Sequence, residues 1–287
     1  MKEYHLGLYE KSMPSYLSWS EKMNNAKEAG FDYIEISIDE TDERLRRLDY
    51  IKEERFVLKK AIHESDIPIY SMCLSGHRKY PFGSRDERTR NKSLEIMEKA
   101  IDFASDIGIR IIQLAGYDVY YEKGDEDTKT MFLKNLRIAC NMASLKGVLL
   151  GFETMETSFM DTVEKSMYYV NKINSPYLGV YPDIGNLTNA SLIYGKSVNE
   201  DLMTGKGHIV ATHLKETLPG CYREIPFGMG HTNYTTQLTL LKEMNVKLFV
   251  GEFWYVGSNN YKKDLIIANE FLRKKLDQVF DVRKKNI

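Results

Sequence analysis

Eight short apolar runs, each followed by a segment of helical character, constrain the fold of this chain more than any other feature. The runs cover residues 6–9, 31–36, 67–74, 109–114, 148–153, 177–181, 209–213 and 246–252, and the helical segments cover 15–29, 51–65, 87–107, 128–146, 158–173, 187–205, 234–244 and 261–280. Such alternation is typical of an α/β protein with a parallel sheet and helical crossovers. Eight units predict closure into a single (β/α)8 TIM barrel, with an open doubly wound sheet as the alternative.

The length of the chain agrees with one barrel domain over residues 1–287. An α/β barrel typically takes about 250 residues as one domain. The sequence contains no linker, low-complexity segment or short internal repeat that would divide it. No Gly-rich GxGxxG motif follows the first apolar run, so a dinucleotide-binding fold has no support.

Charge and cysteine content exclude several classes of partner. The 40 basic and 41 acidic side chains leave a net charge of −1, which gives no electrostatic footprint for nucleic acid or an anionic membrane. The three cysteines, Cys73, Cys140 and Cys221, are widely spaced and form neither a CxxC pair nor a disulfide framework. No stretch resembles a signal peptide or approaches the roughly 20 apolar residues of a membrane helix. We therefore expect a cytoplasmic protein that binds neither nucleic acid nor membrane.

Four of the later apolar runs end in side chains that can bind a metal ion. These are Glu153, Asp183, His213 and Glu252, each about one strand–helix unit or more from the next. Active sites of α/β barrels lie at the carboxyl ends of the strands, so we expect the four to converge at one face. Three carboxylates and an imidazole suit a divalent ion such as Mn²⁺, Co²⁺, Zn²⁺ or Mg²⁺. Such an ion would also relieve the mutual repulsion of the carboxylates.

A site of this kind suggests proton transfer on a sugar. A metal ion that holds adjacent oxygens of a 2-ketose makes the neighbouring C–H acidic and stabilises the resulting enediolate. Two carboxylates on opposite faces of the sugar could then remove and return the proton. Glu153 and Glu252, at the ends of the fifth and eighth expected strands, form the natural opposed pair. Asp183 and His213 would act as metal ligands only.

Basic residues in two loops are candidates for binding an anionic group of the substrate. His77 and Arg78 follow the third expected strand, and Lys215 and Arg223 follow the seventh. Arginine suits a phosphate because its guanidinium can bind two oxygens at once. The alternative for the first loop is an ordinary solvated charged segment.

The motifs LGLYEK, SGHRKYPFGSRD, QLAGYDVYYE, VYPDIGNL, THLKET and REIPFGMG extend over nearly the whole chain. In these motifs the chain resembles the L-ribulose-5-phosphate 3-epimerases (L-xylulose-5-phosphate 3-epimerases) of ascorbate and pentose catabolism, within the xylose-isomerase-like barrel superfamily. The resemblance implies metal-assisted epimerisation at C3 of a ketopentose 5-phosphate, from L-xylulose 5-phosphate to L-ribulose 5-phosphate. It also implies that Glu153 and Glu252 transfer the proton and bind the metal, and that Asp183 and His213 complete the ligand set.

The sequence departs from related sugar 3-epimerases at a few positions. A histidine often stands three residues after the ligand aspartate, where this chain has Asn186. The PFGxG loop often contains a glutamate and a later aspartate, where this chain has Met229 and Asn233. We expect these changes to lie outside the metal site.

Three other functions stay open at this point. An aldose–ketose sugar isomerase would use a similar metal and enediolate but move the proton between C1 and C2. An endonuclease-IV-like, metal-dependent DNA-repair enzyme would need a basic groove, which the net charge does not favour. A catalytically inactive sugar-binding barrel would not need the acidic residues. Dimers are common in such barrels, so a homodimer is also open, although the sequence shows no interface signature.

Overall fold

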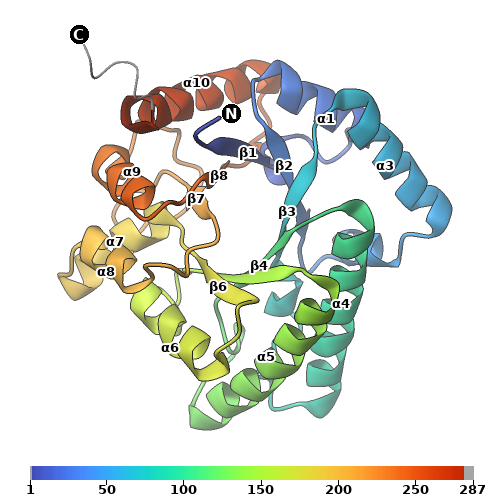
Figure 1. The fold of residues 1–287 in the computed structure, drawn as a ribbon, viewed down its shortest axis with the longest axis vertical. Coiled ribbons are helices and arrows are strands. Elements are labelled where there is room, and N and C mark those ends of the chain that lie inside the picture. Colours follow the sequence, from blue (N-terminus) through green and yellow to red (C-terminus); the bar gives the residue numbers. More distant parts are fainter. Residues whose placement is uncertain (1, 281–287) are drawn as a thin grey trace.

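The computed structural model describes residues 2–280. Within them, eight parallel strands form one sheet in the order β6-β5-β4-β3-β2-β1-β8-β7. The strands are β1 (His5–Tyr9), β2 (Tyr33–Ile38), β3 (Ile69–Leu74), β4 (Ile111–Ala115), β5 (Leu149–Glu153), β6 (Leu178–Tyr181), β7 (Thr212–Leu214) and β8 (Leu248–Gly251). Parallel bridges from Val180 to Ile209 and from Asp183 to His213 bring β7 beside β6 and nearly close the sheet. The prediction of a (β/α)8 TIM barrel is confirmed (Figure 1).

Helices surround the strands on the outside of the barrel (Figure 1). They are α1 (Trp19–Glu28), α2 (Asp42–Leu45), α3 (Lys52–Ser65), α4 (Glu87–Ile107), α5 (Glu126–Lys146), α6 (Val163–Ile173), α7 (Ile184–Tyr194), α8 (Val198–Thr204), α9 (Tyr234–Glu243) and α10 (Tyr261–Phe280). Short 3-10 turns follow three elements: η1 (Glu10–Ser12), η2 (Arg46–Asp49) and η3 (Ser75–Arg78). Among residues 2–280, none of the helices combines the length and apolar character needed to cross a membrane.

The helix ends follow local signals in the sequence. Ser18 begins α1 with a capping box, in which its side chain accepts the backbone N–H of Glu21 and the Glu21 carboxylate accepts the backbone N–H of Ser18. Gly108 ends α4 in the left-handed conformation, with φ of 94°, where a residue with a Cβ would be strained. The single helix expected over 187–205 is wrong, because Gly195 ends α7 with φ of 63° and Ser197 caps a second helix, α8.

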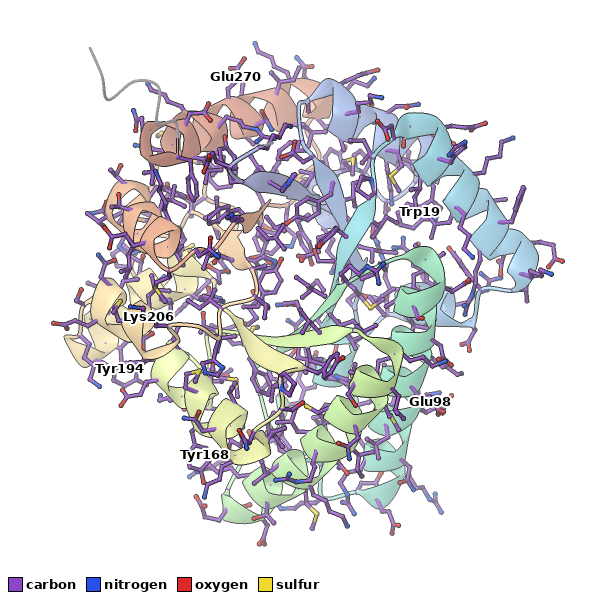
Figure 2. All side chains as sticks on the ribbon, in the orientation of Figure 1. Trp19, Glu98, Tyr168, Tyr194, Lys206 and Glu270 are labelled. Carbon is purple, nitrogen blue, oxygen red and sulfur yellow. The ribbon has the colours of Figure 1, made fainter. Side chains whose placement is uncertain are left out.

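Side chains fill the centre of the barrel, so the opening in the ribbon of Figure 1 is not a pore (Figure 2). Alternate strand residues point inward, and Tyr33, Tyr181 and Val250 are buried there at 2%, 0% and 0% exposure. The opposite strand faces pack against the helices, as Leu6 and Leu8 of β1 do. Side chains that reach the site at the carboxyl end of the barrel therefore come from the strand residues that point inward.

One buried charge cluster holds the segment that leaves β1. Glu10 is fully buried and its carboxylate accepts hydrogen bonds from Lys22 Nζ at 2.6 Å, Arg44 Nη1 at 2.5 Å and Arg47 Nη1 at 2.7 Å. The backbone N–H of Ser37 in β2 donates a further bond at 3.0 Å. Burial alone would raise the pKa of Glu10, but the three cations lower it well below its usual range. The carboxylate thus ties β2, α1, α2 and η2 to the end of β1.

Replacement of Glu10 by glutamine should reduce the free energy of unfolding by roughly 3–5 kcal/mol, because it leaves three cations without their buried partner. Denaturation by urea at pH 7 measures the loss. The folded pKa of Glu10 is lowered, so its contribution is full above the unfolded value near 4.3 and is lost only as pH falls toward the folded value. The control is Glu54→Gln, which removes an exposed ion pair with Arg46 and should change stability little. Equal stability of Glu10→Gln and the natural protein would contradict the role of the cluster.

Candidate active site

The four strand-end residues lie together at the carboxyl face of the barrel. Glu153 is the last residue of β5, Asp183 follows β6, His213 lies in β7 and Glu252 follows β8. One ligand atom of each residue lies within 4.8 Å of those of the other three, and all four side chains are buried. Backbone hydrogen bonds align the ends of neighbouring strands. The N–H of His213 donates to Pro182 O at 2.9 Å, and the N–H of Glu252 donates to Leu214 O at 3.0 Å. We refer to these four residues as the acid cluster.

Two nitrogen-bearing side chains face the carboxylates of the acid cluster. His213 Nδ1 lies 3.2 Å from Glu153 Oε1 and 3.4 Å from Glu252 Oε2. Lys215 Nζ lies 2.5 Å from Asp183 Oδ2 and 3.3 Å from Glu252 Oε2. On the far side of Glu153, the amide Nε2 of Gln113 in β4 donates to Oε2. Each carboxylate of the cluster therefore lies beside at least one nitrogen donor or cation.

Asp183 serves the fold as well as the cluster. Its Oδ1 accepts the backbone N–H groups of Gly185 at 2.8 Å and Asn186 at 3.0 Å, which caps the amino end of α7. Its own backbone N–H donates to Thr154 Oγ1 at 3.0 Å, beside the end of β5. Asn186 donates from Nδ2 to Thr154 O at 2.8 Å, so this residue braces the same loop. The helix cap leaves Oδ2 of Asp183 directed at the cluster.

Burial and neighbouring charges shift the pKa values of the cluster in different directions. Burial raises the pKa of Glu153, and the nearby charge of Glu252 raises it further. Burial also raises the pKa of Asp183 to about 7, against the pull of Lys215. Burial works in the same sense on Glu252, but Lys215 and His213 overcome it and lower the pKa of Glu252. For His213, burial would lower the pKa, yet the carboxylates of Glu35 and Glu252 raise it well above its ordinary value.

The acid cluster fits a divalent metal ion. Its three buried carboxylates share only two cationic groups, because Lys215 lies beside Asp183 and Glu252 and His213 lies beside Glu153 and Glu252. A divalent cation would compensate the remaining negative charge. Three carboxylate oxygens and an imidazole nitrogen form a donor set suited to Mn²⁺, Co²⁺, Zn²⁺ or Mg²⁺. The geometry and the donor types agree with one metal site.

A small cavity leads from the acid cluster to the surface. Its volume is about 70 Å³, room for a few water molecules, so side chains at its mouth must move to admit a sugar phosphate. Four basic residues line it, namely Lys11, Arg78, Lys215 and Arg223. The guanidinium of Arg78 lies 4.7 Å from the ring centre of Tyr120, and Arg223 Nη2 lies 3.1 Å from Glu156 Oε1. Lys11 pairs with Asp39 and Arg223 with Glu156, so Arg78 is the basic residue of the cavity wall that has no ion-pair partner among the described residues.

Of the four predicted phosphate-binding residues, His77 lies away from the cavity, and Lys215, Arg78 and Arg223 line it. The His77 side chain turns into the protein, where Nε2 lies 3.1 Å from Ser93 O and the ring centre lies 4.3 Å from that of Phe82. His77 is 4% exposed and does not line the cavity, so it is a packing residue. Lys215 does line the cavity, but its ammonium is held at the acid cluster. Arg78 and Arg223 remain at the mouth.

The buried state of His77 should appear in the pH dependence of stability. Burial lowers the pKa of His77 to about 4, so below pH 6.5 the unfolded chain binds a proton that the folded protein does not. This term should remove roughly 3 kcal/mol of unfolding free energy between pH 6.5 and pH 4, and nothing above pH 6.5. Urea denaturation of the natural protein and of His77→Gln at several pH values isolates the term as a difference. Parallel curves for the two proteins would show that His77 is exposed to solvent.

Sequence reasoning missed three residues that the structure brings to the site. Glu35 bonds His213, Gln113 bonds Glu153, and Lys11 lines the cavity mouth. Glu35 in β2 and Gln113 in β4 point into the barrel and are buried. In the sequence, each is a polar residue between apolar neighbours, and this pattern could have marked them. Lys11 follows β1 in the turn η1 and had no distinguishing pattern.

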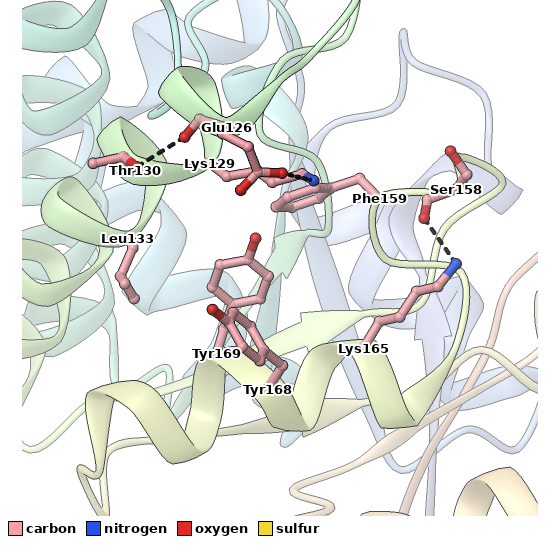
Figure 3. Close-up of a pocket in the computed structure, with 9 residues that line it drawn as sticks. All are labelled: Glu126, Lys129, Thr130, Leu133, Ser158, Phe159, Lys165, Tyr168 and Tyr169. Carbon is pink, nitrogen blue, oxygen red and sulfur yellow. Dashed lines mark hydrogen bonds and ion pairs between the residues drawn. The ribbon is translucent and has the colours of Figure 1, made fainter.

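A larger hollow lies on the outer surface and is separate in its residues from the acid cluster (Figure 3). It lies between α5 and α6 and has a volume of about 370 Å³. Its two lysines are engaged, because Lys129 pairs with Glu126 at 2.7 Å and Lys165 donates to Ser158 O at 2.8 Å. The remaining wall includes Tyr168 and Tyr169 of α6, so the hollow offers no convergent catalytic groups.

Comparison with known proteins agrees with the observed barrel fold. The family described as xylose isomerase-like TIM barrel matches residues 23–275. The L-ribulose-5-phosphate 3-epimerase UlaE of Salmonella heidelberg is 40% identical over 276 residues, 96% of this chain and 96% of that protein. SgbU of Haemophilus influenzae, provisionally named an L-ribulose-5-phosphate 3-epimerase, is 42% identical over 285 residues, 97% of this chain and 98% of that protein. A solved L-ribulose 3-epimerase shares the fold with a TM-score of 0.76 at 15% identity, covering 96% of this chain and 95% of that one.

Proposed function

Because the chain belongs to the xylose isomerase-like TIM barrel family, and within it to the L-ribulose-5-phosphate 3-epimerases, we propose that it epimerises a ketopentose 5-phosphate at C3. The substrate pair is L-xylulose 5-phosphate and L-ribulose 5-phosphate, supplied by ascorbate or pentose catabolism. The observation that carries the proposal is the convergence of Glu153, Asp183, His213 and Glu252 at the carboxyl face of the barrel, where one ligand atom of each lies within 4.8 Å of the others and all four side chains are buried. A cytoplasmic location and a single catalytic domain over residues 1–287 complete the proposal.

Glu153 and Glu252 transfer the proton in this proposal. A lowered pKa keeps Glu252 ionised and ready to accept the C3 proton, while a raised pKa lets Glu153 hold a proton for the opposite face. In the reverse direction the two residues exchange roles. The C3–H bond breaks on one face and forms on the other through an enediolate, so no oxidant or reductant is needed.

The neighbours of the pair control its protonation. Lys215 lies 3.3 Å from Glu252 Oε2 and stabilises the ionised carboxylate. Gln113 bonds Oε2 of Glu153 and fixes the orientation of that side chain. Glu153, Asp183, His213 and Glu252 would hold the divalent ion. When bound, that ion supplies Lewis-acid polarisation of the substrate ketone, which makes the C3 proton acidic.

The basic residues of the cavity wall suit the substrate phosphate. Arg78 is half-buried and its Nε has no hydrogen-bond partner among the described residues, so a donor is free for an anion. Arg223 and Lys11 line the same opening. With the sugar at the acid cluster, a 5-phosphate would extend toward these cations. Arginine can bond two phosphate oxygens at once, which would also fix the orientation of the chain of carbon atoms.

The variants Glu153→Gln and Glu252→Gln should each abolish exchange of the C3 proton of L-xylulose 5-phosphate with D₂O, a loss of roughly 10²-fold to 10⁴-fold. NMR at C3 measures the exchange, and circular dichroism checks the fold. The matched control is Glu98→Gln on the exposed face of α4, which should exchange normally. Chelation should stop exchange in the natural protein and added Mn²⁺ should restore it. Normal exchange in either active-site variant would contradict the assignment, and exchange at C1 instead of C3 would identify an aldose–ketose isomerase.

The variant Arg78→Ala should raise KM for the phosphorylated pentulose by roughly 10-fold to 100-fold, because a charge-assisted hydrogen bond is worth roughly 1.5–3 kcal/mol. KM for the free pentulose should change much less. Steady-state kinetics on both substrates give the ratio, with His77→Gln as the neighbouring control that should leave it unchanged. Equal effects of Arg78→Ala on both substrates would remove the phosphate role from Arg78.

A further inference from the structure

A further buried acid, Glu35 of β2, lies against the side of His213 that faces away from the other carboxylates. Glu35 is 0% exposed, and its Oε1 lies 2.6 Å from His213 Nε2. Its Oε2 accepts the hydroxyl of Ser71 in β3 at 2.7 Å and the hydroxyl of Tyr181 in β6 at 2.8 Å. Three groups from three different strands therefore hold one carboxylate in the centre of the barrel.

The two ring nitrogens of His213 have different surroundings. Nε2 meets Glu35, whereas Nδ1 lies 3.2 Å from Glu153 Oε1 and 3.4 Å from Glu252 Oε2. A carboxylate only accepts hydrogen bonds, so the nitrogen beside Glu35 carries a proton. Nδ1 also lies beside carboxylates, so it too carries a proton when no cation is bound. A cation held at the acid cluster would replace the Nδ1 proton, whereas Nε2 keeps its proton because Glu35 accepts it at 2.6 Å.

The carboxylate of Glu35 is costly for the fold. A buried negative charge needs several hydrogen bonds to be tolerated, and Ser71 and Tyr181 supply two of them. The ring of His213 is already positioned by packing, since the ring centre of Tyr181 lies 5.0 Å away and that of Tyr9 lies 6.3 Å away. Packing alone would not require an acid at this place. The charge is explained if it acts on the protonation and basicity of the imidazole.

We propose that Glu35 is a positioning residue that holds the proton of His213 on Nε2, presents the Nδ1 lone pair to the acid cluster, and so sets the affinity of the site for a divalent cation. The inference rests on the metal site of the proposed function, but it concerns metal binding and not the reaction. Glu35 is not itself a ligand in this arrangement, because both of its oxygens are used by His213, Ser71 and Tyr181.

The first test uses the natural protein. With ¹⁵N-labelled histidine and bound Zn²⁺, long-range ¹H–¹⁵N NMR should show a proton on Nε2 of His213 and a metal-bound Nδ1, with the resonance assigned by its absence from His213→Asn. Metal bound through Nε2, or a proton on Nδ1, would overturn the inference. This measurement uses the unsubstituted protein, so it tests the inference even if the Glu35 variants do not fold.

The second test compares affinities for Mn²⁺ by calorimetry. Glu35→Gln keeps the size of the side chain but removes the charge, and should weaken Mn²⁺ binding roughly 10-fold to 100-fold, as loss of a partner of a metal-binding histidine typically does. The matched control is Tyr33→Phe in the same strand. Its hydroxyl donates to Phe249 O at 2.9 Å and hydrogen-bonds neither Glu35 nor His213, so its loss should leave the affinity unchanged.

The tautomer should change with the affinity. In the metal-free natural protein both ring nitrogens of His213 should carry protons. In metal-free Glu35→Gln, the ¹⁵N shifts of His213 should move toward the neutral form protonated on Nδ1 alone, which a purely structural effect of the substitution would not produce. An Mn²⁺ affinity equal to that of the natural protein would overturn the inference while leaving C3 epimerisation untouched. Conversely, an absence of epimerase activity with the expected metal and NMR results would overturn the proposed function alone.

Discussion

Confinement of three carboxylates in one buried space is the constraint on which the rest of the site depends. Glu153, Asp183 and Glu252 come from successive parts of the barrel and cannot all be ionised there without cations. His213 and Lys215 supply part of the compensation, and they distribute it unevenly. The unequal compensation separates the pKa values of Glu153 and Glu252, and this separation is the basis of the proposed proton transfer.

The same face of the barrel contains the converse arrangement. At the end of β1, Glu10 is surrounded by three cations, and its pKa is lowered instead of raised. No titration near neutral pH is expected of such a group, so the cluster serves structure. Buried carboxylates thus have different roles in the two places. At Glu10 the cations outnumber the carboxylate, whereas in the acid cluster the carboxylates outnumber the cations.

The sequence was sufficient to predict the barrel and the gathering of the four strand-end residues. Both depend on features that repeat along the chain: the alternation of strands and helices, and the position of a polar residue at the end of an apolar run. The order of the strands follows from short connections between neighbours, and the structure has that order.

The direction of individual side chains could not be predicted in the same way. His77 and Arg78 are adjacent in sequence, but the 3-10 turn η3 sends His77 into the core and Arg78 to the cavity. Lys215 lies two residues after His213, on the same side of the chain, so the alternation of an extended segment brings it to the acid cluster instead of the mouth. Glu35 required knowledge of which strands face each other across the barrel.

Asp183 caps a helix and also belongs to the acid cluster. Its presence in a relative is therefore weaker evidence of activity than the presence of a residue that serves the cluster alone. Oδ1 of Asp183 caps α7, and loss of such a cap typically costs about 1 kcal/mol of stability. A descendant of this protein that no longer acted on sugars would still lose stability by replacing Asp183, and replacement of Glu252 would remove a carboxylate that pairs with both His213 and Lys215. Replacement of Glu153 would instead relieve the repulsion from Glu252 that raises its pKa. Over evolutionary time an inactive copy should therefore keep Asp183 and Glu252 and lose Glu153 first. For judging which relatives remain enzymes, Glu153 is the more informative position.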